Sequence, residues 1–199
     1  MGLRIRYSAF GAFLLSLALL GAPVRATAQE KPRPPLPIPE VLFIPTPDDI
    51  VIRMLELANV KKDDVVYDLG CGDGRILVSA VQKFGCRAVG YDIDPRRVSD
   101  SRDNLKKNGV EERARVEEKD LFLVDLRPAT VVTLYLSPKY NVRLIPQLET
   151  MRPGSRIVSH LFDMKGVRPE KVAEYASKDG HMHTLFLWTT PLKKTAARK

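Results

Sequence analysis

Amphipathic stretches alternate with short, mostly apolar and β-branched runs along the chain from residue 46 onward. In each amphipathic stretch the apolar residues recur every three or four positions, which places them on one face of a helix. Runs of four to six residues bounded by charged or turn-forming residues are typical of strands. The pattern predicts helices over residues 46–58, 75–84, 95–108 and 137–151, and strands over residues 65–68, 88–92, 114–117, 131–136, 156–160, 171–175 and 184–189.

Two of the predicted helices begin with specific signals. Thr46 followed by Pro47 is expected to cap and begin the first helix, and Ser137 followed by Pro138 the last one. Pro146 lies inside the last helix. It must kink or restart that helix, because proline lacks the amide hydrogen that an inner helical turn requires.

The alternation of strand and helix predicts an α/β fold. Such a chain builds a mostly parallel sheet with helices on both faces, a Rossmann-like doubly wound arrangement. The last two of the seven predicted strands have no clear helix between them. We therefore expect them to form an antiparallel hairpin at one edge of the sheet.

The first 28 residues have the three-part layout of a secretory signal peptide. Two arginines precede the apolar residues 9–22, and Ala26-Thr27-Ala28 forms a small-residue cleavage site. The apolar stretch is shorter than the roughly 20 residues that cross a bilayer comfortably. We expect an exported protein, periplasmic or extracellular. The alternative is an uncleaved segment that anchors the chain to a membrane through residues 8–22.

Residues 29–45 are rich in proline and are expected to form a stiff extended tether. The folded domain is expected over residues 46–199. That length is enough for one domain with a full core but not for two.

The charge balance is mildly basic. The chain has 32 basic and 24 acidic residues, a net charge of +8, and the net charge without residues 1–28 is +5. An ordinary solvated surface explains so small an excess. Because no block of lysine and arginine alternates with aromatic residues, we expect no nucleic-acid partner. The oligomeric state is not predicted.

Cys71 and Cys86 lie at opposite ends of the predicted helix 75–84. A helix of about ten residues separates its ends by roughly 15 Å, and a disulfide tolerates only about 7 Å between Cα atoms. We therefore expect two free thiols. The three histidines have no cysteine pair near them, so no metal site is predicted.

A glycine-rich loop, Asp68-Leu69-Gly70-Cys71-Gly72-Asp73-Gly74, joins the first predicted strand to the second predicted helix. Glycines there let the backbone approach a ligand closely, and the helix start offers unpaired amides. A dinucleotide fingerprint reads G-x-G-x-x-G, whereas this loop reads G-x-G-x-G with an acid, Asp68, two residues before Gly70. That carboxylate suits the ammonium of S-adenosylmethionine. Methyl transfer is the first interpretation, and a dehydrogenase is the second.

In an open parallel sheet a ligand lies outside the carboxyl ends of the strands. Asp92 ends the second strand 24 residues after Asp68, close to the offset of about 20 residues expected of a carboxylate that binds ribose hydroxyls. Asp94, directly before a proline, fits a helix cap better. After the third strand, Asp120 is expected to accept a hydrogen bond from an adenine amino group while Leu121 or Phe122 packs on the ring. A turn acid is the alternative for Asp120.

The methyl acceptor is expected at the ends of the fourth and fifth strands. Tyr135, Ser137 and Pro138 follow the fourth strand, but a core tyrosine and a helix cap explain them equally well. His160 ends the fifth strand and could take the proton that an amine loses on methylation, with a purely structural histidine as the alternative. Methyl transfer needs mainly an in-line approach and a dry site, so no general base is assigned.

These motifs resemble those of class I S-adenosylmethionine-dependent methyltransferases, and more narrowly the family of ATP synthase c-subunit lysine methyltransferases and their bacterial relatives. The resemblance extends from about Phe43 to the end of the chain. The glycine loop carries the likeness to the superfamily, and residues 43–47 and 133–138 carry the likeness to the narrower family. The segments that match are residues 43–47, 65–75, 90–95, 130–138 and 156–164.

The resemblance implies that Pro45 and Thr46 fold over the cofactor as a lid. It also implies a protein lysine as the acceptor, with a membrane protein as one expected substrate. The expected cofactor-binding residues are Pro45, Thr46, Asp68, Gly70, Cys71, Gly72, Gly74, Asp92, Ile93, Asp120 and Leu121, and the expected substrate-binding residues are Tyr135, Ser137, Pro138 and His160.

Two other functions stay open: a small-molecule methyltransferase, and an exported protein that binds S-adenosylmethionine without turnover. A small-molecule enzyme usually needs a lid or extra helices to enclose its substrate, and only the short segment before Val65 offers one. The export signal departs from the pattern, because S-adenosylmethionine is made in the cytoplasm. The cofactor supply of an exported copy is unexplained.

Overall fold

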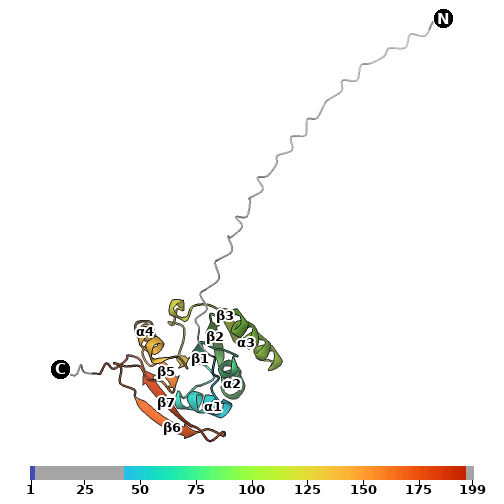
Figure 1. Ribbon diagram of the computed structural model, residues 1–199. Coiled ribbons are helices and arrows are strands. Elements are labelled where there is room, and N and C mark those ends of the chain that lie inside the picture. Colours follow the sequence, from blue (N-terminus) through green and yellow to red (C-terminus); the bar gives the residue numbers. More distant parts are fainter. Residues whose placement is uncertain (3–42, 196–199) are drawn as a thin grey trace. The chain divides into compact units, whose positions relative to one another are not determined.

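The central strand β1 pairs in parallel with a neighbour on each side, and the rest of the sheet extends from it (Figure 1). The computed structural model describes residues 1–2 and 43–195. Seven strands lie in the order β3-β2-β1-β4-β5-β7-β6. The strands are β1 (Val65–Leu69), β2 (Arg87–Asp92), β3 (Ala114–Glu118), β4 (Val131–Leu134), β5 (Arg156–His160), β6 (Lys171–Ala176) and β7 (Met182–Thr189).

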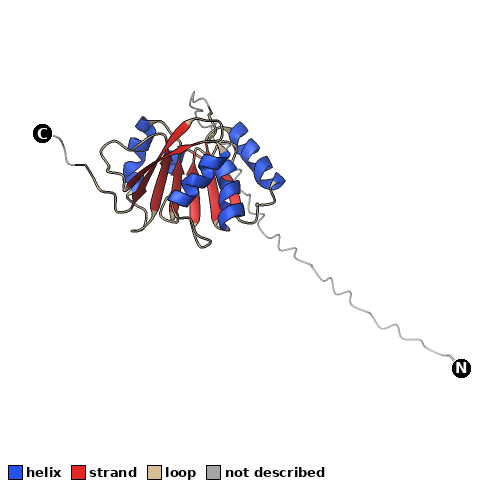
Figure 2. Cartoon of the chain, turned by 90° about the horizontal axis from the view of Figure 1, so that it is seen from below, coloured by secondary structure: helices blue, strands red, loops and turns tan. Residues whose placement is uncertain are grey.

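Helices cover both faces of this sheet (Figure 2). The apolar sides of α1, α2 and α3 share one core cluster with one face, and α4 shares a second cluster with the other. Side chains of a strand alternate between the two clusters, as a pleated strand requires. The helices are α1 (Asp48–Leu57), α2 (Arg75–Phe84), α3 (Pro95–Lys107), α4 (Pro138–Leu148) and a short 3₁₀ turn, η1 (Leu121–Leu123).

The predicted α/β fold with an antiparallel edge hairpin is confirmed. β1 to β5 pair with one another in parallel, whereas β7 runs antiparallel to both β5 and β6. Because β1, β2, β4 and β5 run in the same direction, their carboxyl ends meet at one edge of the sheet. Asp68 and His160 therefore lie on the same edge, although they come from different parts of the chain.

One predicted helix start is wrong. α1 begins at Asp48 with Pro47 in the capping position, and no side chain makes a cap hydrogen bond. Thr46 Oγ1 instead lies 3.0 Å from His160 Nδ1. The Thr46 hydroxyl therefore contacts a residue 114 positions away and does not cap the helix. The residues around Thr46 give no sign of this distant partner.

The other helix ends follow the sequence more closely. Asp94 caps α3, because its Oδ1 accepts a hydrogen bond from the Arg96 amide at 2.9 Å. Ser137 occupies the capping position of α4, and Pro138 is the first helical residue. Of the two outcomes expected at Pro146, a kink or a restart, the restart does not occur, because α4 continues through this residue to Leu148. Pro146 lies near the end of α4, where its missing amide removes a hydrogen bond without ending the helix.

Both cysteines are free and buried, as expected. Cys71 lies in the loop before α2, and Cys86 follows the end of that helix. Cys71 also packs against Gly90 of β2. A Cβ on Gly90 would come within 2.7 Å of both Cys71 Sγ and Leu77 Cδ1, so only glycine fits there.

The expected signal segment, residues 1–28, lies outside the described residues apart from Met1 and Gly2, and so does the expected tether up to residue 42. Across residues 43–195 no helix has the length and apolar character needed to cross a membrane.

At the opposite edge of the sheet, Asp64 links the starts of three strands. It is 6% exposed and accepts hydrogen bonds from the Lys61 amide at 2.7 Å and from Thr130 Oγ1 at 2.6 Å. The Arg156 guanidinium, from β5, also pairs with it. Removing one partner of a buried ion pair leaves the other charge uncompensated.

Replacing Asp64 by alanine should therefore lower the free energy of unfolding by about 3 kcal/mol. Urea unfolding followed by circular dichroism measures this. Glu56→Ala is the matched control, because it removes an exposed ion pair with Arg53 and should change stability by less than about 1 kcal/mol. Equal losses in the two variants would contradict the role assigned to Asp64.

Candidate active site

The glycine loop, residues 68–74, turns through three left-handed glycines. Gly70, Gly72 and Gly74 have φ angles of 80°, 55° and 76°, a region that other residues rarely adopt. Gly74 occupies the capping position of α2 and offers no side chain there. The start of α2 is therefore left to bind a polar ligand group, as the sequence predicts.

Neighbouring elements hold this loop in shape. The Tyr91 carbonyl of β2 accepts hydrogen bonds from two loop amides, at 2.8 and 3.1 Å. From α3, Ser101 Oγ donates to the Gly72 carbonyl and Asn104 Nδ2 donates to the Asp73 carbonyl, each at 2.9 Å. A loop fixed in this way loses little conformational freedom when a ligand binds.

The ring of Phe43 lies directly over the loop. A Cβ on Gly72 would lie 2.1 Å from Phe43 Cε2, so only glycine fits beneath the ring. The Arg97 guanidinium, from α3, lies 4.7 Å from the centre of the same ring. The segment before α1 therefore reaches back over the glycine loop.

Arg75 fastens that segment, the lid (residues 43–49), to the loop. Its Nη1 donates to the Thr46 carbonyl at 3.0 Å and to Asp48 at 3.3 Å. Its Nε and Nη2 hold the Asp73 carboxylate, Nη2 at 2.6 Å. Thr46 is buried and Pro45 is exposed. The two expected lid residues lie beside the loop, and their contact with a cofactor stays a prediction.

Asp68 is buried at the carboxyl end of β1. Its register partner on β4 is Thr133, whose Oγ1 donates to Asp68 Oδ1 at 2.7 Å. The pKa of the Asp68 carboxyl is raised to about 7, chiefly by burial and to a smaller extent by the charges of Asp92 and Asp73, while the Thr133 hydrogen bond opposes the shift. A cationic ligand group beside it would favour the ionised carboxylate.

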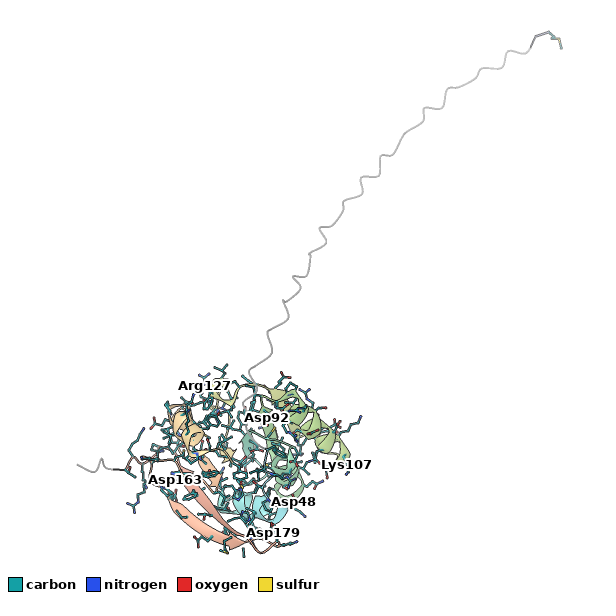
Figure 3. The ribbon with its side chains drawn as sticks, viewed as in Figure 1. Asp48, Asp92, Lys107, Arg127, Asp163 and Asp179 are labelled. Atoms are coloured by element: carbon teal, nitrogen blue, oxygen red, sulfur yellow. The ribbon has the colours of Figure 1, made fainter. Side chains whose placement is uncertain are left out.

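Asp92, near the middle of the folded part in Figure 3, ends β2 next to the loop. Its Oδ2 accepts a hydrogen bond from the Gly72 amide at 2.9 Å and its Oδ1 from the Asp94 amide at 3.0 Å. Each oxygen retains a lone pair that a ribose hydroxyl can use. Ile93 follows it and is half-buried.

Asp120 has the turn role that the sequence offered as an alternative. Its Oδ1 accepts a hydrogen bond from the Phe122 amide at 2.9 Å and so caps η1. Its other oxygen has no partner among residues 43–195, so it stays available to an adenine amino group. Leu121 is half-buried beside it.

An aromatic wall (Tyr135, His160 and Phe162) stands at the ends of β4 and β5. The Tyr135 ring centre lies 4.2 Å from that of His160 and 6.1 Å from that of Phe162. Leu161, between His160 and Phe162 in the sequence, has a φ angle of 62°. A positive φ strains the backbone of a leucine, and such strained residues cluster at functional sites. The structure thus brings Tyr135 and His160 together where the acceptor is expected.

His160 is 1% exposed, and both of its ring nitrogens are engaged. Nδ1 meets Thr46 Oγ1, and Nε2 lies 2.8 Å from Nδ1 of His183 on β7. Burial, with a smaller effect of the charge of His183, lowers the pKa of His160 to about 4. The His160 ring is therefore neutral at physiological pH, and it could take a proton directly only by giving up one of these hydrogen bonds.

Ser137 and Pro138 are exposed at the start of α4. The Ser137 carbonyl accepts the amides of Tyr140 and Asn141, at 2.9 and 3.1 Å, as an ordinary first helical turn does. Their substrate contact stays a prediction.

Sequence reasoning missed several residues of the site. Ser101 and Asn104 are polar residues three apart on one face of a predicted helix, a signal that could have been used. His183 gave no local signal, because its partner His160 lies 23 residues away in the sequence. Arg75 pairs with its near neighbour Asp73, but its partners in the lid, Thr46 and Asp48, lie 29 and 27 residues away.

A surface hollow of about 730 Å³ lies away from this site. It lies between η1 and α4, and Phe122, Leu123 and Arg143 are among its lining residues. No residue of the glycine loop lines it.

The residues at this edge fit S-adenosylmethionine. The left-handed glycines bring bare backbone to the ligand, Asp68 offers a buried carboxylate to its ammonium, and Asp92 and Asp120 have oxygens left for its ribose and adenine. The aromatic wall stands beside them at the ends of β4 and β5.

Known proteins share this arrangement. The family model described as the ANTKMT methyltransferase domain matches residues 68–171. A protein-lysine N-methyltransferase from Saccharolobus islandicus (strain REY15A) is 45% identical over 154 residues, which are 76% of this chain and 94% of that protein. An ATP synthase c-subunit lysine N-methyltransferase from Xenopus laevis is 29% identical over 163 residues, 81% of this chain and 68% of that protein.

A solved structure is also similar. It is described as an RNA methyltransferase from Salinibacter ruber in complex with S-adenosyl-L-homocysteine, and it is 44% identical with a TM-score of 0.70. The match covers 77% of this chain and 97% of that one.

Asp92→Ala should weaken the binding of S-adenosylhomocysteine by about 1.5–3 kcal/mol, the range for a hydrogen bond that involves a charged group. Isothermal titration calorimetry measures the affinity, and circular dichroism checks that the domain remains folded. Asp103→Ala, an exposed change on α3, is the control and should bind normally. Unchanged affinity in Asp92→Ala would remove this residue from the cofactor site.

The affinity for S-adenosylhomocysteine should also depend on pH through Asp68. Below about pH 7 the Asp68 carboxyl takes up a proton, so the affinity should fall by up to about tenfold per pH unit between pH 7 and 5. Asp68→Asn should bind more weakly at pH 7.5 and lose this slope. The same slope in both proteins would show that another group is responsible.

Proposed function

The chain is an S-adenosylmethionine-dependent methyltransferase that belongs to the family of the ANTKMT methyltransferase domain, and we propose that it methylates the side-chain amine of a protein lysine. The observation that carries the proposal is the aromatic wall beside the glycine loop. Tyr135 and Phe162 offer ring faces to a lysine side chain, and aromatic faces attract alkyl ammonium groups. The two relatives named lysine methyltransferases support the same acceptor.

Different residues at the loop would bind different parts of the cofactor. When bound, S-adenosylmethionine supplies an electrophilic methyl group on a sulfonium. Asp68, Asp92 and Asp120 would hold its ammonium, ribose and adenine. Thr46 and Phe43 close over the loop and keep water out, which suits a reaction that needs a desolvated nucleophile.

The acceptor must lose a proton before it can react. A lysine has a pKa of about 10.4, so almost every lysine in neutral solution is an ammonium without a lone pair. The site therefore has to bind the amine in a dry place and let one proton leave.

We further propose that the protein acts outside the cytoplasm or at a membrane surface, and that a membrane protein is among its substrates. The charged start, apolar residues 9–22 and small-residue site of the N-terminal segment support this location. The ATP synthase substrate in the name of the Xenopus relative supports the second part.

RNA is the second candidate acceptor, because the similar Salinibacter structure is described as an RNA methyltransferase. The mild charge of the chain and its lack of a basic block with aromatic residues favour protein over RNA.

Labelled methyl transfer decides between these acceptors. Membrane and soluble fractions would be prepared from a strain that lacks the gene, and incubated with the full-length protein and S-adenosylmethionine labelled in the methyl group. We expect the label in protein, released as N-methyllysine on acid hydrolysis, and strongest in the membrane fraction.

Other outcomes identify the alternatives. Label that ribonuclease removes would support the RNA acceptor and overturn the lysine proposal. Binding of S-adenosylhomocysteine with no label in protein, RNA or small molecules would indicate a binding protein without turnover.

A further inference from the structure

A continuous chain of hydrogen bonds, the histidine chain, runs from the lid to the turn between β6 and β7. Thr46 Oγ1 lies 3.0 Å from His160 Nδ1, and His160 Nε2 lies 2.8 Å from His183 Nδ1. His183 Nε2 lies 3.2 Å from Ser177 Oγ, which bonds to the Asp179 carboxylate. The chain begins at a residue that is 4% exposed and ends at an exposed one.

The chain has one consistent direction. Asp179 has its pKa lowered, chiefly by the Ser177 hydrogen bond, so it is a carboxylate and accepts. Ser177 Oγ donates its only hydrogen to the Asp179 carboxylate. Its oxygen can therefore only accept a hydrogen bond from His183 Nε2. A neutral imidazole donates once and accepts once, so an arrangement in which His183 Nδ1 accepts requires His160 to donate from Nε2 and accept at Nδ1. Thr46 therefore donates to His160, and its oxygen is left to accept.

The position of Thr46 matters because its oxygen, which is left to accept a hydrogen, lies near the expected acceptor site. Its carbonyl is bonded to Arg75 at the end of the glycine loop, and its hydroxyl to His160, which touches Tyr135 at the acceptor end. Thr46 thus lies between the cofactor loop and the aromatic wall.

We propose that the histidine chain carries the proton of the acceptor ammonium from the site to solvent at Asp179. This inference rests on the proposed lysine acceptor. The ammonium N–H bond breaks, its electron pair stays on nitrogen, and the proton bonds to Thr46 Oγ1. In the same movement the Thr46 hydrogen passes to His160 Nδ1.

The remaining links balance in the same way. The Nε2 hydrogen of His160 passes to His183 Nδ1, that of His183 Nε2 to Ser177, and that of Ser177 to Asp179, which releases it to water. After the product leaves, a proton returns from Asp179 through the same links to water in the open site and restores the first arrangement. No oxidant or second substrate is needed.

A structural brace is the alternative explanation, because the lid and the turn are tied elsewhere as well. Asp49 Oδ2 accepts a hydrogen bond from the Lys178 amide at 2.8 Å. In Figure 3, Asp179 and Asp48 lie at the same end of the molecule, consistent with this tie. Asp49→Ala breaks the tie but leaves the histidine chain intact, so it is the matched control.

The test measures N-methyllysine formation by the full-length protein between pH 7 and 10, with the membrane fraction of the strain lacking the gene as acceptor. Ser177→Ala should lower the rate at pH 7 by about tenfold, because it breaks the path far from the cofactor. The deficit should shrink toward pH 10, where the lysine is increasingly neutral. Ser177→Thr, which keeps the hydroxyl, should restore the rate, and the affinity for S-adenosylhomocysteine should be unchanged throughout.

Other titratable groups lie near the histidine chain. They are Tyr135 after β4, Tyr175 on β6, which is the register partner of His183, and Lys178, Asp179 and His181 in the turn; Asp49 and Arg75 lie at the lid end. If Asp49→Ala lowers the rate of N-methyllysine formation as much as Ser177→Ala does, and with the same pH dependence, proton transfer is overturned and the contacts serve only as a structural brace. So would a deficit in Ser177→Ala that is the same at every pH.

A second measurement needs no turnover. Nitrogen-15 NMR of the histidine side chains in the unaltered protein should find His160 and His183 both protonated at Nε2 only. Protonation at Nδ1 of either ring would overturn the proposed direction. Absence of N-methyllysine with the unaltered enzyme would overturn the lysine acceptor itself, whereas normal activity with an unchanged Ser177→Ala profile would overturn the relay alone.

Discussion

The glycine loop and the acids around it depend on the parallel pairing of β1 with β2 on one side and with β4 on the other. The chain leaves β1 for β2 and β3 and later returns to the opposite side. The glycine loop therefore stands where the strand order reverses, with a strand end on each flank. Asp68 is held by Thr133 from β4, and the loop is held by Tyr91 and Asp92 from β2. Changing either pairing would move the acid away from the glycines.

The two edges of the sheet have different roles. At the edge where strands begin, charges are paired and satisfied, as around Asp64. At the edge where strands end, the same fold keeps a buried carboxyl with a raised pKa, a strained leucine and a buried pair of imidazoles. Such features lower stability unless the surrounding structure supports them. The groups that lower stability therefore lie together at the edge where strands end, and the ion pair of Asp64 with Arg156 lies at the edge where strands begin.

The sequence predicts the parts of this fold that local patterns determine. Strand and helix order, the edge hairpin, the glycine loop and the Asp94 cap follow from periodicity, glycine placement and capping chemistry over a few residues. Thr46 is a residue for which these local patterns give the wrong prediction. Its neighbours indicate a helix cap, but its hydroxyl lies against His160, 114 residues away. His183 was missed for the same reason, because its partner His160 lies 23 residues away. The bond from Arg75 to the Thr46 carbonyl was missed likewise, although the other partner of Arg75, Asp73, is a near neighbour.

The two buried cysteines give the fold a tolerance to its chemical surroundings. Burial raises the pKa of the Cys71 thiol well above its usual value and that of Cys86 to about 11. At neutral pH almost no thiolate forms at either sulfur, and the thiolate is the species that oxidants and disulfides attack. Neither sulfur therefore offers a ready point for oxidative damage or mispairing, even without a reducing glutathione pool. A chain whose first residues have the layout of an export signal thus keeps an unpaired cysteine, Cys71, within its glycine loop without exposing that loop to oxidation.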